Sequence, residues 1–290
     1  MTKRKFDIVT DSGGDMPKEY YEKHGVKCVP LGFTMNNVNY EGENGERIAP
    51  KAFYDKLHEG AMPTTYQVTG EQAMKYIEPS LKQGNDVLVI SFSSGLSGTA
   101  GSFIVAARTL AKVYPKRTVK VVDSLCASMG EGLLLDYAIK KADEGESLEN
   151  VAKYLEKLKG KICHQFTVDN LYHLKRGGRV SSTTAIIGSI LKIKPIMRMD
   201  EMGKLEVVGK AMGRKKSLGI LAEKLFESIA SENEPIFISH GDCLEDVEYV
   251  KKLILERYPK AEITVEYIGA VIGSHAGAGT LAIFYRGKNR

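Results

Sequence analysis

The stretch VLVISFSSGLSGT, residues 87–99, decides how the rest of the chain is interpreted. Its first six residues carry apolar side chains on both faces, which is typical of a buried strand in a parallel sheet. The small and polar residues that follow predict a turn, and we expect a long helix from there to about residue 113. Strand, polar turn and helix in this order are one unit of a doubly wound α/β domain.

The same order recurs on both sides of this stretch. Residues 6–10 predict an earlier strand, and residues 119–122 predict a later one that is followed by helices over 129–143 and 147–159. Ligand sites in such sheets lie outside the carboxyl ends of the strands. We therefore expect three polar turns to gather at one edge of the sheet: Asp11-Ser12, 93–99 and Asp123-Ser124.

The segment between residues 26 and 83 predicts a less regular arrangement. We expect a β-rich run over 26–33, a hairpin or loop over 38–48, a loop over 62–67, and helices over 50–59 and 70–83. The loop over 62–67 carries a proline followed by two threonines, which is a common way to turn and cap the next helix.

The length of 290 residues suggests one large domain or two domains of ordinary size. A second unit begins near residue 160, so we predict an N-terminal α/β domain over 1–160 and a C-terminal α/β domain over 161–290. In the second domain we expect strands over 163–168, 236–238, 263–268 and 281–285, a hairpin over 193–208, and helices over 181–191, 215–229 and 244–257.

Composition excludes several classes of protein. Hydrophobic residues make up 43% and charged residues 27%, which is the mix of a globular chain rather than a disordered or fibrous one. The net charge of +5 permits an anionic ligand without requiring nucleic acid. There is no apolar run of about 18 residues and no signal-peptide core at the N-terminus. The four cysteines form no CxxC pair, so we expect reduced thiols in the cytosol rather than a zinc site.

Signatures of nucleotide and hydrolase chemistry are missing. No Gly-Lys pair is followed by serine or threonine, and no strand is followed by GxGxxG. The segment GLSGT, residues 95–99, fails the hydrolase pattern GxSxG at its last position. What remains is a helix N-terminus with hydroxyls at Ser94, Ser97 and Thr99, which favours an anion. The alternative is that Ser97 only caps its helix.

Three further residues are candidates for ligand contact, each with a structural alternative. Thr65 could face a ligand or belong only to a capped turn. His275 lies in the glycine-rich segment GSHAGAG, residues 273–279, where the backbone can approach a ligand closely. Arg179 ends the basic turn KRGGR, residues 175–179, which could hold a phosphate or simply face solvent. A second basic run, residues 210–216, is interpreted as a solvated face.

Several short motifs occur in a fixed order along the chain: Asp11-Ser12, PTTYQ over 63–67, SSGLSGT over 93–99, Asp123-Ser124, GGRVS over 177–181, Lys194-Pro195 and GSHAG over 273–277. Together they resemble the DegV family, which includes the fatty-acid-binding FakB subunits of bacterial fatty acid kinase. The resemblance covers essentially the whole chain.

The resemblance implies two α/β domains, the first with a mainly parallel sheet, and a long-chain fatty acid at the domain junction. It implies that Thr65 and Ser97, with Ser94 as a close alternate, and His275 bind the carboxyl group, and that Arg179 contacts phosphate or a partner. A separate ATP-dependent kinase subunit would convert the carboxyl to an acyl phosphate for phospholipid synthesis. The chain itself would be a cytoplasmic carrier rather than an enzyme. It would need no cofactor or metal and would be compatible with transient contact with a membrane surface.

Three positions depart from the family pattern. Tyr66 stands where serine is common, Ala278 replaces the proline of a frequent GPG turn, and Met212 stands where many members carry arginine. The last departure bears on docking to the kinase subunit.

Two other functions compete with this interpretation. The first is a serine hydrolase acting on lipid esters through Ser97 and His275, with Asp11 or Asp123 orienting the histidine. The second is a DNA-binding protein, which the mild positive charge suggests. The sequence shows no helix-turn-helix with a basic recognition face, so we do not expect nucleic acid as a partner.

Overall fold

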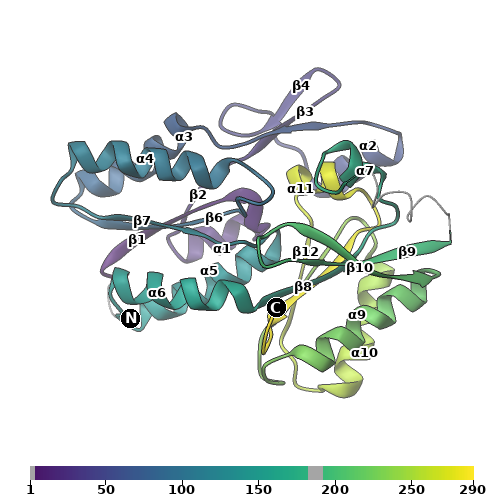
Figure 1. The fold of residues 1–290 in the computed structure, drawn as a ribbon. Coiled ribbons are helices and arrows are strands. Elements are labelled where there is room, and N and C mark those ends of the chain that lie inside the picture. The colour runs from purple at the N-terminus through teal and green to yellow at the C-terminus, as the bar shows by residue number, and fades with distance from the viewer. Residues whose placement is uncertain (1–3, 182–191) are drawn as a thin grey trace.

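The computed structural model describes residues 4–181 and 192–290. These residues form two halves that lie side by side, each built around its own β-sheet (Figure 1). The expected α/β class, with a mainly parallel sheet in the first half, is confirmed. The helix predicted over 181–191 lies almost entirely outside the described residues.

The N-terminal half contains a parallel sheet in the order β2-β1-β6-β7. Its strands are β1 (Phe6–Asp11), β2 (Lys27–Val29), β6 (Asp86–Ser91) and β7 (Val119–Asp123). Alternate residues of β6 face opposite sides, so Val87 and Val89 pack on one helical layer and Leu88 and Ile90 on the other. The first layer contains α3 (Gly70–Lys82) and α4 (Thr99–Val113); the second contains α1 (Lys18–Lys23), α5 (Met129–Asp143) and α6 (Leu148–Leu158) (Figure 1).

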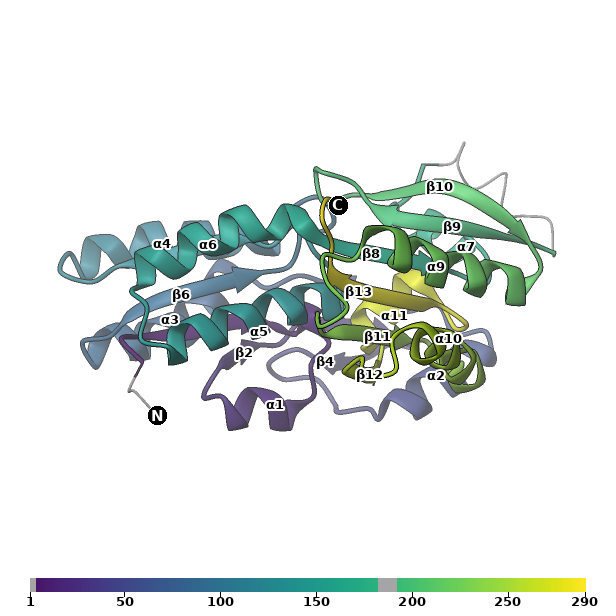
Figure 2. The ribbon, with the colours of Figure 1, turned by 90° about the horizontal axis from the view of Figure 1, so that it is seen from below.

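The C-terminal half contains a six-stranded mixed sheet in the order β10-β9-β8-β13-β11-β12, in which β11 and β12 run parallel and the other pairs are antiparallel. Its strands are β8 (Ile162–Thr167), β9 (Ile193–Met199), β10 (Leu205–Met212), β11 (Ile236–His240), β12 (Ile263–Tyr267) and β13 (Leu281–Arg286). Helices α9 (Arg214–Ser228) and α10 (Leu244–Arg257) cover one face. The other face turns toward α5 of the first half (Figure 2). There Phe166 and Phe284 share a buried cluster with Leu88.

A small antiparallel sheet in the order β4-β3-β5 joins the two halves on another side. Its strands are β3 (Gly32–Met35), β4 (Val38–Glu41) and β5 (Thr64–Tyr66). The helix α11 (Ala270–Ala276), from the end of the chain, packs against β3, β5, α2 (Pro50–His58) and α7 (Tyr172–Arg176). Two short 3-10 turns, Ser12–Gly14 and Lys159–Lys161, complete the elements of the described residues.

Three local expectations are corrected by this arrangement. The β-rich run over 26–33 is not one strand, because it divides at Pro30 into β2 of the parallel sheet and β3 of the small sheet. The expected loop over 62–67 contains β5, whose backbone pairs with β3. His275 lies in the last turn of α11 rather than in a loop. In each case a partner far away in sequence supplies the backbone hydrogen bonds or the packing surface.

The connection between the halves is short. Helix α6 ends at Leu158 and β8 begins at Ile162, so the parallel sheet and the mixed sheet are built from consecutive parts of the chain. The described ranges contain no helix long and apolar enough to cross a membrane.

Candidate functional site

A cavity of about 530 Å³ lies where the two halves meet. Its volume falls in the range of ligand pockets, about 300–1,000 Å³. The N-terminal half contributes residues after β1 and β6 and from the segment just before α5, and the C-terminal half contributes the open face of the mixed sheet and α11. The cavity is therefore at the domain junction expected for the ligand.

Most of the cavity wall that the described residues form is apolar. Residues of β8, β9 and β13 and of the start of β10 form one side, and α11 and the β6–α4 turn form others. The apolar side chains are Leu31, Phe92, Leu96, Phe166, Leu174, Met199, Leu205, Ile268, Val271, Ile272 and Phe284. Such a wall favours a ligand that buries hydrocarbon.

Part of the cavity lining is polar, and we call it the polar end. It contains four of the sequence-predicted residues: Thr65, Ser97, Arg179 and His275. The Thr65 hydroxyl on β5 lies 2.8 Å from Nε2 of His275 on α11. Desolvation, followed by the charges of Arg179 and Arg176, lowers the pKa of His275 to about 4, so the imidazole is neutral near pH 7. Nδ1 of His275 is buried and has no partner among the described residues.

The tautomer of His275 decides what Thr65 offers to a ligand. A buried N–H without a partner costs more than a buried lone pair, which favours a proton on Nε2 and none on Nδ1. Nε2–H then donates to the Thr65 hydroxyl oxygen, and the hydroxyl proton is left to donate into the cavity. The pair can supply an oriented hydrogen-bond donor without placing a charge at the site.

Ser97 also lines this end of the cavity, just before α4. Its hydroxyl lies 3.0 Å from that of Thr99 and accepts a hydrogen bond from the Thr99 N–H at 3.3 Å. Ser94 is exposed and lies outside the set of described residues that line the cavity; its N–H donates to Asp123. Of the two serines, the structure therefore leaves Ser97 as the candidate for carboxyl contact.

Two arginines bind backbone carbonyls close to these groups. Nη2 of Arg176 donates to the carbonyls of Pro63 at 2.9 Å and Ser274 at 3.0 Å, two residues before Thr65 and one before His275. Sequence reasoning missed Arg176, because nothing in the basic turn separates it from its charged neighbours.

Arg179, the predicted phosphate or partner contact, binds the backbone of the serine loop. Its Nε and Nη2 donate to the Leu96 carbonyl at 3.2 and 3.0 Å, and Nη1 donates to the Gly177 carbonyl. These bonds join the loop before Ser97 to the turn after α7. Arg179 also lines the cavity, and two of the five N–H groups of its guanidinium are not used by these bonds. Its first structural role is to fix the position of Ser97.

The geometry argues against the hydrolase. His275 contacts Thr65 rather than Ser97, and no carboxylate among the described residues meets its Nδ1. The Asp11 carboxylate accepts hydrogen bonds from Gly13, Ser91 and Phe92 instead. The Asp123 carboxylate accepts hydrogen bonds from two backbone N–H groups, that of Leu125 after β7 and that of Ser94 after β6. The described residues therefore do not form a catalytic triad of nucleophile, base and orienting acid around Ser97 and His275.

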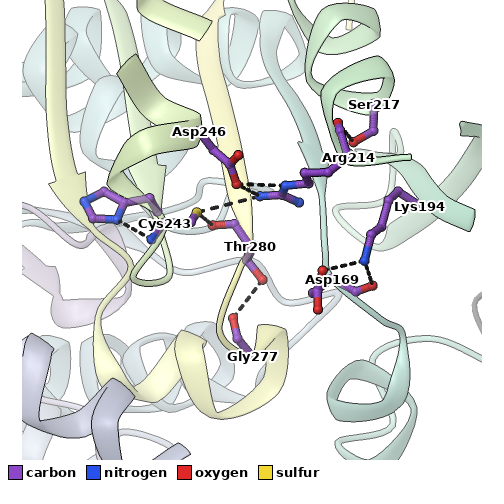
Figure 3. Close-up of polar contacts among 9 residues, drawn as sticks. Asp169, Lys194, Arg214, Ser217, Cys243, Asp246, Gly277 and Thr280 are labelled. Carbon is purple, nitrogen blue, oxygen red and sulfur yellow. Dashed lines mark hydrogen bonds and ion pairs between the residues drawn. The ribbon is translucent and has the colours of Figure 1, made fainter. Parts of the chain in front are cut away.

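Two basic residues of the C-terminal half, Lys194 and Arg214, are held in ion pairs (Figure 3). Lys194 forms an ion pair with Asp169 at 2.5 Å, and Arg214 forms one with Asp246 at 2.7 Å. The expectation of a solvated basic face over 210–216 is thus wrong at Arg214, which bridges to α10. Nearby, the Thr280 hydroxyl donates to the Gly277 carbonyl at 2.9 Å and fixes the turn that follows α11 (Figure 3).

The fold and the cavity define an α/β protein of two halves with an apolar ligand cavity between them. A family model for the DegV family, described as one of uncharacterised proteins, matches residues 5–288. The chain belongs to the DegV family.

Relatives of known sequence and structure agree with this assignment. A DegV domain-containing protein of Clostridium perfringens is 44% identical over 288 residues, 99% of each chain. A DegV family protein from Thermus thermophilus, whose structure is reported as fatty acid binding, is 32% identical with a TM-score of 0.87 over 98% of this chain and 100% of that one. DegV from Bacillus subtilis, named a fatty acid binding protein, is 32% identical with a TM-score of 0.84 over 99% and 100%.

Proposed function

We propose that this protein binds one long-chain fatty acid in the cavity between its halves, with the carboxyl group at the hydroxyls of Thr65 and Ser97 and with His275 orienting the hydroxyl of Thr65. The observation that carries the proposal is a largely apolar cavity with oriented hydroxyls at one end. Relatives of about the same length, at 32% identity, are named fatty acid binding proteins, which supports the same ligand here.

The energetics of such a ligand agree with the site. Each methylene buried from water contributes about 0.8 kcal/mol, so about 14 methylenes contribute on the order of 10 kcal/mol before the costs of binding. A buried carboxyl group needs hydrogen-bond partners, because an unpaired one is costly. The hydroxyls of Thr65 and Ser97 can each donate one hydrogen bond to it.

We further propose that the protein presents this carboxyl to a separate ATP-dependent kinase subunit, which forms an acyl phosphate for phospholipid synthesis. Among the residues lining the polar end, Gly98 and Tyr66 are exposed, so this end of the ligand lies near solvent. Nucleotide motifs are missing from the sequence, which agrees with a phosphoryl donor held elsewhere. The two remaining N–H groups of Arg179 could meet the phosphoryl group or an acidic partner.

The same proposal includes a carrier role in the cytoplasm, transient contact with a membrane surface during exchange, and a division into domains at residue 160. Every strand of the parallel sheet precedes that residue and every strand of the mixed sheet follows it, which supports the division.

Native mass spectrometry of the protein purified from bacteria tests the binding step. We expect a bound mass that denaturation releases and lipid analysis identifies as a long-chain fatty acid. A lipid-free protein with no saturable binding of any such acid would contradict the proposal. Incubating the loaded protein with ATP and a fatty acid kinase subunit tests the second step, through acyl phosphate trapped with hydroxylamine.

A further inference from the structure

The cavity opens to solvent beside the proposed carboxyl site. Of the described residues that line it, only Tyr66, Gln67 and Gly98 are exposed. Tyr66 and Gln67 directly follow Thr65 in the chain, and Gly98 directly follows Ser97. The proposed carboxyl site is therefore reached from solvent between the end of β5 and the start of α4.

Helix α4 extends from this opening along the outer layer of the N-terminal half (Figure 1). Its inner side packs into the core through Phe103, Ala106 and Leu110. Exposed residues spaced by three and four positions share its outer side. We call this surface, which begins at the opening, the α4 face; it consists of Gly98, Gly101, Val105, Arg108 and Lys112.

The α4 face is apolar near the opening and basic farther along the helix. Val105 is 57% exposed, and Ile104 at its edge is 38% exposed. Among the ion pairs of the described residues, none contains Arg108 or Lys112. By contrast, Lys82 on the neighbouring α3 pairs with Glu78 at 3.0 Å.

The segment that carries this face has no negative charge of its own. Between Asp86 and Asp123 the sequence contains no acidic residue, whereas it contains five basic ones, at 108, 112, 116, 117 and 120. Of these, Arg117 lies 3.8 Å from Asp86. Because Arg108 and Lys112 are not neutralised in this way, the α4 face favours a partner whose surface is acidic.

The orientation of the ligand decides between two partners of negative charge, a lipid bilayer and a protein. A bilayer holds a fatty acid by its tail, so the tail has to lead when the acid passes into it. In the proposed pose the carboxyl group lies at this opening and the tail lies among the apolar residues of the wall. The opening therefore presents the group that reacts, which favours a protein that acts on the carboxyl.

We propose that the α4 face is the docking surface for the kinase subunit, which meets Val105 and Ile104 with an apolar patch and Arg108 and Lys112 with acidic residues around it. This inference rests on the proposed function. An apolar centre with a charged rim is the usual anatomy of a protein interface. Docking here places the phosphoryl donor directly over the opening that leads to Thr65 and Ser97.

The test measures acyl phosphate formation as a function of the concentration of the loaded protein, with ATP and the kinase subunit. For Arg108→Glu and Val105→Glu, we expect KM for the loaded protein to rise at least about fivefold while kcat stays within about twofold. Neither residue lines the cavity, so fatty-acid affinity should not change. For the wild type, KM should rise between about 0.05 M and 0.5 M salt, and Arg108→Glu should reduce that rise.

The matched control is Lys153→Glu on α6, an exposed lysine in the helical layer on the other side of the parallel sheet. It makes the same change of charge and should leave KM unchanged. Circular dichroism and fatty-acid titration of each variant verify that the fold and the cavity are intact.

KM values for both α4 variants within twofold of the wild type would overturn the docking surface and leave the proposed function intact. A loss of flotation with anionic phosphatidylglycerol vesicles for Arg108→Glu, with KM unchanged, would assign the α4 face to a membrane and overturn the proposal as well. No acyl phosphate from the loaded wild type would instead contradict the proposed transfer step, and the docking surface with it.

Discussion

The Thr65 hydroxyl and Nε2 of His275 lie 2.8 Å apart, although 210 residues separate them in the chain. One residue is on a three-residue strand of the N-terminal half and the other is on a seven-residue helix near the C-terminus. Their contact brings the two halves of the protein together at the polar end of the cavity. Any change that moves either residue should therefore be measurable as a change in ligand affinity.

Removing the Thr65 hydroxyl tests its contact with the carboxyl group. Thr65→Val keeps the shape of the side chain and should weaken fatty-acid binding by about 5- to 150-fold, because a hydrogen bond to a buried carboxyl is lost. Thr64→Val is the matched control, since Thr64 is exposed on the same strand and lies outside the cavity lining. Equal affinities for the two variants, measured by titration calorimetry, would remove Thr65 from the site.

The position of His275 depends on a glycine. Gly177 has a helical backbone conformation, but a Cβ there would collide with Nδ1 of His275. Gly177→Ala should displace the imidazole, break its bond to Thr65, and weaken fatty-acid binding by about tenfold or more. Gly101→Ala on α4, where a Cβ meets nothing within 4 Å, should bind normally and be slightly more stable. Normal binding by Gly177→Ala would mean that His275 does not position the ligand contact.

Arg176 should act on affinity through the backbone carbonyls that it binds next to β5 and within α11. Arg176→Met loses the hydrogen bonds to the Pro63 and Ser274 carbonyls, each worth about 1.5–3 kcal/mol, so both the free energy of unfolding and the fatty-acid affinity should fall. Arg176→Lys should restore part of both. Arg198→Met, which removes an exposed ion pair to Glu206, should cost less than about 1 kcal/mol and leave affinity unchanged. Denaturant titrations and binding curves of the three variants would separate these effects.

Asp15 should make stability depend on pH. Desolvation raises its pKa from 3.8 to about 7, so the folded state binds more protons than the unfolded state between these values. Its contribution to stability is therefore present below about pH 4 and is lost as the pH rises through 7. Asp15→Asn removes this loss, so the free energy of unfolding of the variant relative to wild type should rise between about pH 4 and pH 7 and level off above that. Parallel urea titrations of both proteins would contradict the assignment if the difference stays constant.

Much of the fold could be predicted because its signals are local. The run over 87–92 is apolar on both faces, and only a strand with helices on both sides buries it fully. Ser147 accepts from the Asn150 N–H as a cap should, and its helix begins where predicted. The expected fold class and family are confirmed for the same reason, because both were predicted from short motifs and from hydrophobic periodicity, which are local features of the sequence.

The parts that could not be predicted depend on distant partners. Thr64–Tyr66 has no strand pattern of its own and is a strand only because β3 offers it a free edge. The glycines over 273–279 predict a loop, yet packing against α2, β3 and β5 stabilises a helix through His275. Arg176 has its role because the fold places the carbonyls of Pro63 and Ser274 next to its guanidinium, and no sequence pattern predicts those two contacts. The carboxyl contacts of Thr65 and Ser97, and the part that His275 plays through Thr65, stay predictions.

Because the cavity lies between the two halves, its occupancy should affect how long the folded protein persists in a cell. A ligand that fills it becomes part of the packing that joins both sheets, so folding stability rises with the ratio of free ligand to dissociation constant. An empty molecule opens more often and is exposed to proteases for longer, whereas a loaded one is protected. For a protein that takes its ligand as proposed, its abundance would thus follow the supply of that ligand without any change in gene expression.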